Sequence, residues 1–138
     1  MLAQATSDLF GYLTGIPALA QTTGLAVGGA LPDPGDALVK LPAAWILFAG
    51  EETLEDERVG QPSVLGNGVL TFWVMLYIPY KGQADLLATQ LPLLEAVKQA
   101  IHGQTASTGK RWQFQASHLV LINTDRMGYR LIFSVDSI

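Results

Sequence analysis

Hydrophobic side chains recur at helical spacing near the start of the chain. Between residues 2 and 14 the apolar positions repeat with the period of an amphipathic helix. Gly15 and Pro17 follow, and both residue types favour the end of a helix. The side that we expect to face the core consists of Leu2, Thr6, Leu9, Phe10 and Leu13.

A second segment with helical period covers residues 83–102. Its expected inner face consists of Leu87, Leu91, Leu94 and Ile101. Pro92 interrupts the pattern, because a proline inside a helix removes a backbone hydrogen bond and costs about 3 kcal/mol. We therefore expect either a kink at Pro92 or a helix that begins afresh near Leu91, with Pro92 in its first turn. Gly103 is suited to cap the C-terminal end.

Apolar runs bounded by turn residues predict the strands. Residues 42–50 are almost entirely apolar, which predicts a strand buried on both faces near the centre of a sheet. The sequence Gly66-Asn67-Gly68 is typical of a hairpin turn, and we expect it to join a short strand near 61–65 to a longer strand at 69–79. Residues 15–40 are rich in glycine and proline and predict a loop with at most one short strand.

The last third of the chain also reads as strands. Trp112 and Phe114 alternate with Arg111, Gln113 and Gln115, as in a half-exposed strand. Two further strands are predicted at 119–122, which we expect to be buried, and at 129–135, around a polar turn. The order of helix, strands, helix and strands predicts an α+β fold. Residues 1–138 would form one domain, with a mostly antiparallel or mixed sheet flanked by the N-terminal helix and the second helix.

Composition adds an expectation of self-association. The 138 residues are 49% hydrophobic and only 14% charged, against about 25% charged residues in an average domain. There is no cysteine, which excludes disulfides and thiol chemistry. Residues 9–32 carry no charge, but glycines and a proline interrupt the run. We therefore expect a soluble, unprocessed protein made in the cytoplasm rather than a membrane span.

The negative charge of the chain is concentrated in one place. Five of the 12 acidic residues and one basic residue lie between 51 and 58, and the net charge of the whole chain is −4. The segment could be a solvated loop that keeps an apolar protein soluble. It could instead dock a basic partner, or line a ring through which DNA passes without being gripped. The acidic side chains are Glu51, Glu52, Glu55, Asp56 and Glu57.

Candidate chemistry is sparse. Residues 103–109 resemble a phosphate-binding loop, but five residues separate the two glycines, and the segment leaves a helix and enters a strand, so we expect a flexible connector. His102 and His118 have no acid or nucleophile at a recognisable spacing. We expect no enzymatic activity, no cofactor and no metal ion. The three tryptophans are expected to pack in the core, with Trp112 as the candidate anchor of a subunit interface.

The whole layout resembles a family of virion proteins. An N-terminal helix and a Gly/Pro-rich loop precede an apolar strand, an acidic insertion, a long strand, a helix and a terminal pair of strands. The stretches that carry the resemblance are 42–50, the strand ending Tyr77-Ile78-Pro79, the helix closing at Gly103, 119–123 and 128–134. Together they resemble the small tail terminator proteins of long-tailed bacteriophages, particularly those with contractile tails.

The resemblance implies an α+β protomer of a hexameric ring with no catalytic residues. Such a ring caps the tail tube at its head-proximal end, stops its growth and offers a surface to the head and neck, at the tail–neck junction of the virion. The implied partners are further copies of the chain, the tail tube protein and neck or connector proteins, with the sheath protein as a further candidate. DNA would pass through without specific recognition, and no membrane is involved.

Two expectations about surfaces follow. The ring interface is expected around Arg111, Trp112, Gln113 and Gln115 and in the loop 24–31, while the acidic segment faces the lumen or a partner. Two other functions remain open. One is a phage neck or tail-completion protein, which also forms rings. The other is a small-molecule binding module whose pocket is lined by the tryptophans.

Overall fold

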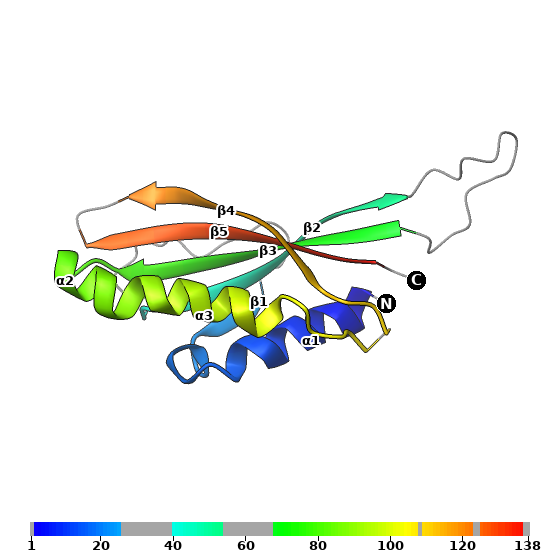
Figure 1. Cartoon of the computed structure of the whole chain (residues 1–138), viewed down its shortest axis with the longest axis horizontal. Helices are drawn as coiled ribbons and strands as arrows, with labels where there is room; N and C mark the ends of the chain where they lie inside the picture. The colour runs from blue at the N-terminus through cyan, green and yellow to red at the C-terminus, as the bar shows by residue number, and fades with distance from the viewer. Residues whose placement is uncertain (1, 26–39, 54–67, 108, 123–124, 137–138) are drawn as a thin grey trace, which may run out of the picture.

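A computed structural model describes residues 2–25, 40–53, 68–107, 109–122 and 125–136. Along the chain, runs of helix and runs of strands follow one another, which is typical of an α+β fold (Figure 1). The elements are α1 (Leu2–Thr14), the 3₁₀ turn η1 (Pro17–Leu19), β1 (Thr23–Leu25), β2 (Ala43–Thr53), β3 (Gly68–Pro79), α2 (Gln83–Asp85), the π-helical turn η2 (Leu86–Gln90), α3 (Leu91–Ile101), β4 (Gln113–Ile122) and β5 (Arg126–Asp136).

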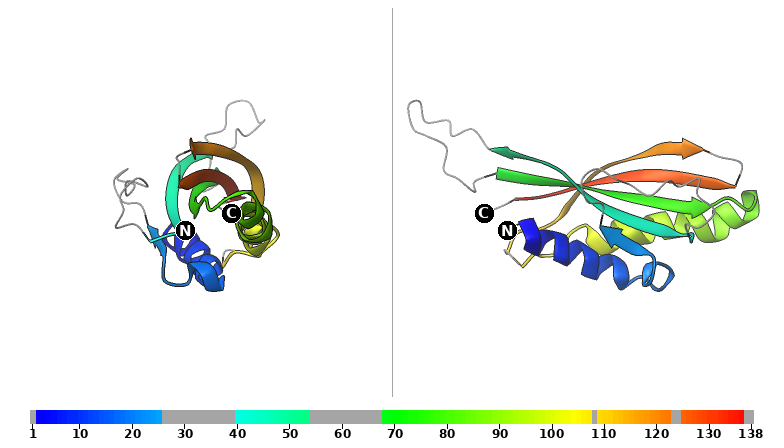
Figure 2. Two further views of the ribbon diagram at one scale, coloured as in Figure 1. Left: turned by 90° about the vertical axis from the view of Figure 1, so that its left-hand side faces the viewer. Right: turned by 180° about the vertical axis from the view of Figure 1, so that it is seen from behind.

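The strands form one mixed sheet in the order β1-β2-β3-β5-β4. Only the β1–β2 pair is parallel, and the other three pairs are antiparallel. Seen end-on, the sheet curls into an arc, and the helices lie along its concave side (Figure 2). The expected α+β class, with a mostly antiparallel sheet flanked by an N-terminal helix and a second helix, is therefore confirmed.

The core lies between the concave face of the sheet and the two long helices. The central strand β3 contributes every second residue to it, as the two-residue period of a strand requires. From the helices come Ala5, Leu9 and Leu13 of α1 and Leu93, Val97 and Ile101 of α3, all buried. From the middle of the sheet come Leu70, Phe72, Val74, Leu76 and Ile78 of β3 and Leu131, Phe133 and Val135 of β5.

Helix α1 has the predicted bounds, but its buried face was predicted only in part. Leu9 and Leu13 are buried as expected, and Ala5 is buried with them. Leu2 and Phe10 are exposed, at 41% and 39%. Leu2 is the first helical residue, and Phe10 lies to one side of the face centred on Ala5 and Leu9, so neither side chain reaches the sheet.

Pro92 lies in the first turn of α3, which is the second of the two predicted arrangements. Immediately before it the chain makes a π-helical turn, in which the N–H of Leu91 donates to the carbonyl of Leu86. This wider turn leads into α3 without requiring an N–H from Pro92. The predicted inner face is correct only in part. Ile101 is buried and Leu94 packs against the core, but Leu87 is 62% exposed, and the other buried residues of α3 are Leu93 and Val97.

Strand β2 is buried on both faces only in its first part. β1 has three residues and pairs with Ala44, Trp45 and Ile46, and no other described strand pairs with β2 on that side. Phe48 is 39% exposed, and a β-bulge follows it. The expected strand near 61–65 and most of the turn at 66–68 lie outside the described residues. The strand paired with β3 on this side is β2.

Gly24 offers a direct test of the β1–β2 contact. A Cβ at this position would overlap the ring of Trp45, which lies against the glycine. We expect Gly24→Ala to lower the free energy of unfolding by about 1–3 kcal/mol, because the ring must move out of its packed position. Denaturant unfolding monitored by tryptophan fluorescence measures this. Gly11→Ala is the matched control, since nothing lies near its Cβ and alanine stabilises a helix by about 1 kcal/mol. Equal effects would contradict the close packing.

Candidate assembly surfaces

Trp112 is the centre of the core and not a surface anchor. Its side chain is completely buried, and its ring meets that of Phe72 edge to face at a centroid distance of 5.5 Å. The expected role of Trp112 in a subunit interface is therefore wrong. The alternation that was read from the sequence is present, and Arg111, Gln113 and Gln115 are the exposed residues. Of the four predicted interface residues, these three remain available.

Replacing Trp112 tests this assignment. We expect Trp112→Ala to lower the free energy of unfolding by about 3–5 kcal/mol, because it leaves a large cavity beside Phe72. Arg111→Ala, at the next position but on the surface, is expected to change it by less than about 0.5 kcal/mol. Thermal and urea unfolding of both variants measures the difference. A small loss for Trp112→Ala would mean that its ring is not part of the core.

The segment between α3 and β4 is a hydrogen-bonded turn rather than the flexible connector that we expected. Gly103 and Trp112 pair across its base, with the Gly103 N–H donating to the Trp112 carbonyl at 2.9 Å. Nearer its tip, the Ala106 N–H donates to the Lys110 carbonyl at 2.7 Å. Gly103 and Gly109 have φ of 82° and 89°, which glycine adopts without strain. These hydrogen bonds hold the backbone of the turn, and Lys110 and Arg111 extend from it.

Helix α1 holds this turn in place. The Asp8 carboxylate accepts hydrogen bonds from the Ser107 N–H at 2.9 Å and the Ser107 hydroxyl at 2.8 Å. The Tyr12 hydroxyl donates to the Thr105 carbonyl at 3.3 Å. Partial burial raises the pKa of Asp8, but the hydrogen bonds from Ser107 and Gln4 outweigh it, so the net pKa is lowered. Burial and the nearby charge of Asp8 both raise the pKa of Tyr12.

The Asp8–Ser107 contact predicts a pH-dependent contribution to stability. Because the folded-state pKa of Asp8 is lowered, the contribution is complete above the unfolded value and is lost as the pH falls through the folded value. We expect Asp8→Asn to cost about 1 kcal/mol near neutral pH, a modest amount because the site is partly exposed. The cost should shrink as the pH falls through the folded-state pKa of Asp8 and disappear once Asp8 is protonated in both states. Urea unfolding across this range measures it, with the exposed Asp136→Asn as control. A cost independent of pH would contradict the prediction.

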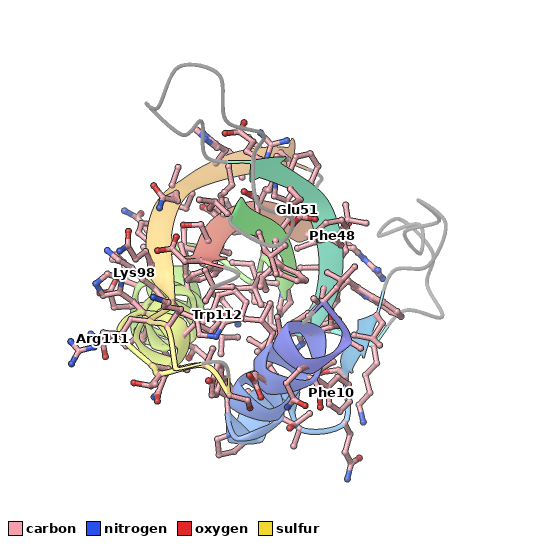
Figure 3. The ribbon with its side chains drawn as sticks, turned by 90° about the vertical axis from the view of Figure 1, so that its right-hand side faces the viewer. Phe10, Phe48, Glu51, Lys98, Arg111 and Trp112 are labelled. Carbon is pink, nitrogen blue, oxygen red and sulfur yellow. The ribbon has the colours of Figure 1, made fainter. Side chains whose placement is uncertain are left out.

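The turn and the nearby end of α3 carry a group of cations. Lys110 and Arg111 are both exposed, and the Lys98 ammonium lies over the ring of Phe114 at 4.7 Å. Within the described part of the chain, neither Lys110 nor Arg111 is paired with a carboxylate. We call Lys98, Lys110 and Arg111 the basic edge. In Figure 3 the Lys98 and Arg111 side chains project from the same side of the molecule.

Two of the five predicted acidic residues lie on the opposite side. Glu51 and Glu52 are exposed at the end of β2, rather than in a loop, and we call this pair the acidic end of β2. Figure 3 shows Glu51 and Phe48 across the molecule from Lys98 and Arg111. Glu55, Asp56 and Glu57 lie outside the described residues. So do residues 26–31 of the predicted 24–31 interface, while residues 24–25 belong to β1.

The outermost strands of the sheet both expose apolar side chains. On β4, Leu119, Val120 and Ile122 are exposed, Ile122 at 72%. The prediction of a buried strand at 119–122 is therefore wrong, because β4 is the last strand of the sheet and has only β5 beside it among the described strands. At the other edge, Leu25 of β1 and Phe10 of α1 are exposed and line a hollow of about 470 Å³ together with Ala3, Thr6 and Ser7. The apolar run at 119–122 was the sequence signal, but its exposure depends on the strand order.

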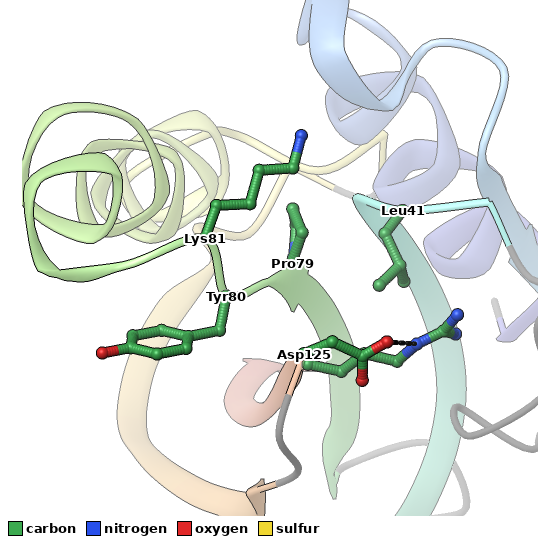
Figure 4. A pocket seen from close by; sticks show the side chains of 6 residues that line it. Leu41, Pro79, Tyr80, Lys81 and Asp125 are labelled. Atoms are coloured by element: carbon green, nitrogen blue, oxygen red, sulfur yellow. Dashed lines mark ion pairs between the residues drawn. The ribbon is translucent and has the colours of Figure 1, made fainter.

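A second hollow, of about 320 Å³, lies where β2 begins and β3 ends (Figure 4). Leu41, Pro79, Tyr80 and Lys81 form part of its wall, with Asp125 and Arg126. The Arg126 Nε lies 3.6 Å from the Asp125 carboxylate, and the Tyr80 N–H donates to the Asp125 carbonyl at 2.7 Å. Asp125 thus interacts with both Arg126 and Tyr80. No tryptophan is among the described residues that line this hollow.

The tryptophans do not share a pocket. Trp45 lies against Gly24, and the Trp73 ring lies under the Arg130 guanidinium at 4.6 Å. Trp112 lies on the other side of the sheet, in the core. A binding module lined by the three tryptophans, the alternative read from the sequence, therefore has no site in the described residues.

The histidines are separate from each other and from any carboxylate in the described ranges. His102 ends α3, and its Nδ1 accepts a hydrogen bond from the Phe114 N–H at 3.0 Å. His118 is exposed within β4. No group of three or more potential metal ligands occurs among the residues that the structure describes. In the same part of the chain, no helix has the length and apolar character needed to cross a bilayer.

The chain was compared with protein-family models, with curated proteins and with solved structures. No family model matches the chain, and no curated protein matches it. Among solved structures, the chain is similar to one from the "Virion of native gene transfer agent (GTA) particle", with a TM-score of 0.59 and 14% sequence identity. The alignment covers 97% of this chain and 94% of that one. At this identity the likeness establishes the α+β fold over nearly the whole length.

Proposed function

We propose that this chain is a structural protein of a phage-type virion. In the specific form of the proposal it is a tail terminator, a hexameric ring at the head-proximal end of the tail tube. The ring stops tube polymerisation and provides the surface to which the head and neck attach. Its partners are further copies of itself, the tail tube protein and the neck proteins, with the sheath as a further candidate, and DNA passes through it without being recognised.

The observation that carries the proposal is the full-length likeness to a virion chain. A fold shared over 97% of this chain and 94% of the other is that of a whole protomer and not of one motif. The layout of the sequence resembles tail terminators independently of that likeness. A fold hosts many functions, so the assembly itself has to be tested.

The surface supports a ring in a second way. Exposed apolar side chains occur at both outer strands, on β4 and on β1 with α1. A closed ring uses two different surfaces of each subunit, one for each neighbour. A neck or tail-completion ring would use the same surfaces, and it differs from a terminator in what it binds.

The mass of the native protein tests the ring. We expect six copies of 14.8 kDa, roughly 89 kDa, by light scattering, with annular particles in negative stain. Tail tubes purified from the same virion are then added, and co-sedimentation and end-labelled images are recorded. Binding to tube ends supports a terminator, and binding to head connectors instead supports the neck protein. A monomer that ignores both would contradict the proposal.

A further inference from the structure

We infer that the ring contact joins the β4 edge of one copy to the β2 edge of the next. The basic edge would face the acidic end of β2, and the exposed apolar residues of β4 would pack against the same neighbouring copy. The inference rests on the proposed ring and specifies the surfaces that close it. It assigns the acidic end of β2 to a neighbouring copy rather than to the lumen.

The pairing of the strands places the charged groups at the same end of the sheet. Gln113 at the start of β4 pairs with Ser134, Ser134 pairs with Thr71, and Thr71 pairs with Gly50. These four paired residues form one row across the sheet, perpendicular to the strands. The row begins at Gln113, next to the basic edge, and ends at Gly50, next to Glu51. The cations and carboxylates therefore lie at one height along the strands, at opposite edges of the sheet.

The exposed apolar groups do not share one height along the strands. Leu25 pairs with Ile46, Ile46 with Val74, Val74 with Leu131, and Leu131 with Ser117 of β4. Leu119, Val120 and Ile122 therefore lie farther from the charged end than Leu25 does. The rows match the charged groups alone: a rotation about an axis along the strands brings the basic edge of one copy to the height of the acidic end of β2 in the next.

Charge also favours this contact over a two-fold dimer. In a two-fold contact whose axis runs along the strands, the basic edges of two copies would face each other at one height, as would the acidic ends in such a contact through β2. Like charges repel, whereas the head-to-tail contact pairs cations with carboxylates. Lys110 and Arg111 are both exposed, and within the described residues neither has a carboxylate partner.

The backbone of β4 indicates that side chains make the contact. Its pairing with β5 is interrupted twice, between Phe114 and Ala116 and between Leu119 and Leu121. Bulges of this kind bend an edge strand and discourage the addition of another strand. The exposed side chains around the second bulge, Leu119, Val120 and Ile122, would pack against the neighbouring copy.

A charge exchange between two variants tests the inference. Variant A carries Lys110→Glu and Arg111→Glu, and variant B carries Glu51→Lys and Glu52→Lys. Alone, each presents the same sign on both surfaces, so we expect its native mass to fall roughly sixfold to that of a monomer. In an equal mixture every A–B contact again pairs opposite charges, and a ring with an even number of positions can alternate. Native mass spectrometry should show rings with equal numbers of A and B.

The controls separate this inference from the proposed function. Lys40→Glu with Lys81→Glu changes the charge as variant A does but lies elsewhere, and this variant should still form rings. Ile122→Ser should weaken assembly at least tenfold without changing the unfolding of the monomer. Circular dichroism checks that each variant is folded. If wild type forms rings and A or B alone does too, or if the mixture fails, the inference is overturned and the ring stands. If wild type never assembles, even on tail tubes, both fall.

Discussion

The packing of Trp112 against Phe72 fixes the region on which the surface arrangement depends. Trp112 directly follows Lys110 and Arg111 of the turn, and its ring packs on Phe72. Its backbone forms hydrogen bonds with Gly103 and Gln104 just after α3. Its burial therefore determines where the helix ends and β4 begins. Asp8 and Tyr12 hold the other side of the turn. Only 14% of the residues of the chain are charged. Two of the cations, Lys110 and Arg111, lie on a turn whose backbone is held by these contacts.

The strand order explains why the central strand β3 is buried whereas the outermost strands expose apolar side chains. β3 has a partner along both sides, and its alternate residues are buried under α1 and α3. Among the described strands, β1 has only three residues, so it covers a small part of the outer edge of β2, and none lies along the outer edge of β4. Apolar residues that would be core in a central strand, such as Phe48 and Ile122, are exposed here. Association with another protein surface would remove such residues from water.

Local patterns in the sequence predicted the elements, whereas burial required knowledge of their neighbours. The bounds of α1, the long strand β3 and the restart at Pro92 followed from spacing and from the chemistry of proline and glycine. The core packing expected for the tryptophans is confirmed for Trp112, whereas its candidate role in a subunit interface and the burial expected for residues 119–122 were wrong. Alternation indicates which residues share a face, but not which face is covered. The order of the strands depends on contacts between distant segments, so the sequence alone did not predict it.

The distribution of charge limits how copies of this chain can come together. Each copy carries a net charge of −4, and the segment 51–58 accounts for all of it, since the remaining seven acidic residues balance seven basic ones. If the acidic segments converged on the lumen of a ring, six concentrations of like charge would crowd a small volume, and the repulsion would oppose closure. If the acidic end of β2 lies against the basic edge of a neighbour, two of these carboxylates meet cations at every contact. The attraction at each contact then offsets part of the repulsion between the acidic segments. The remaining acidic residues would still give the ring a negative surface, which a DNA backbone would pass without binding.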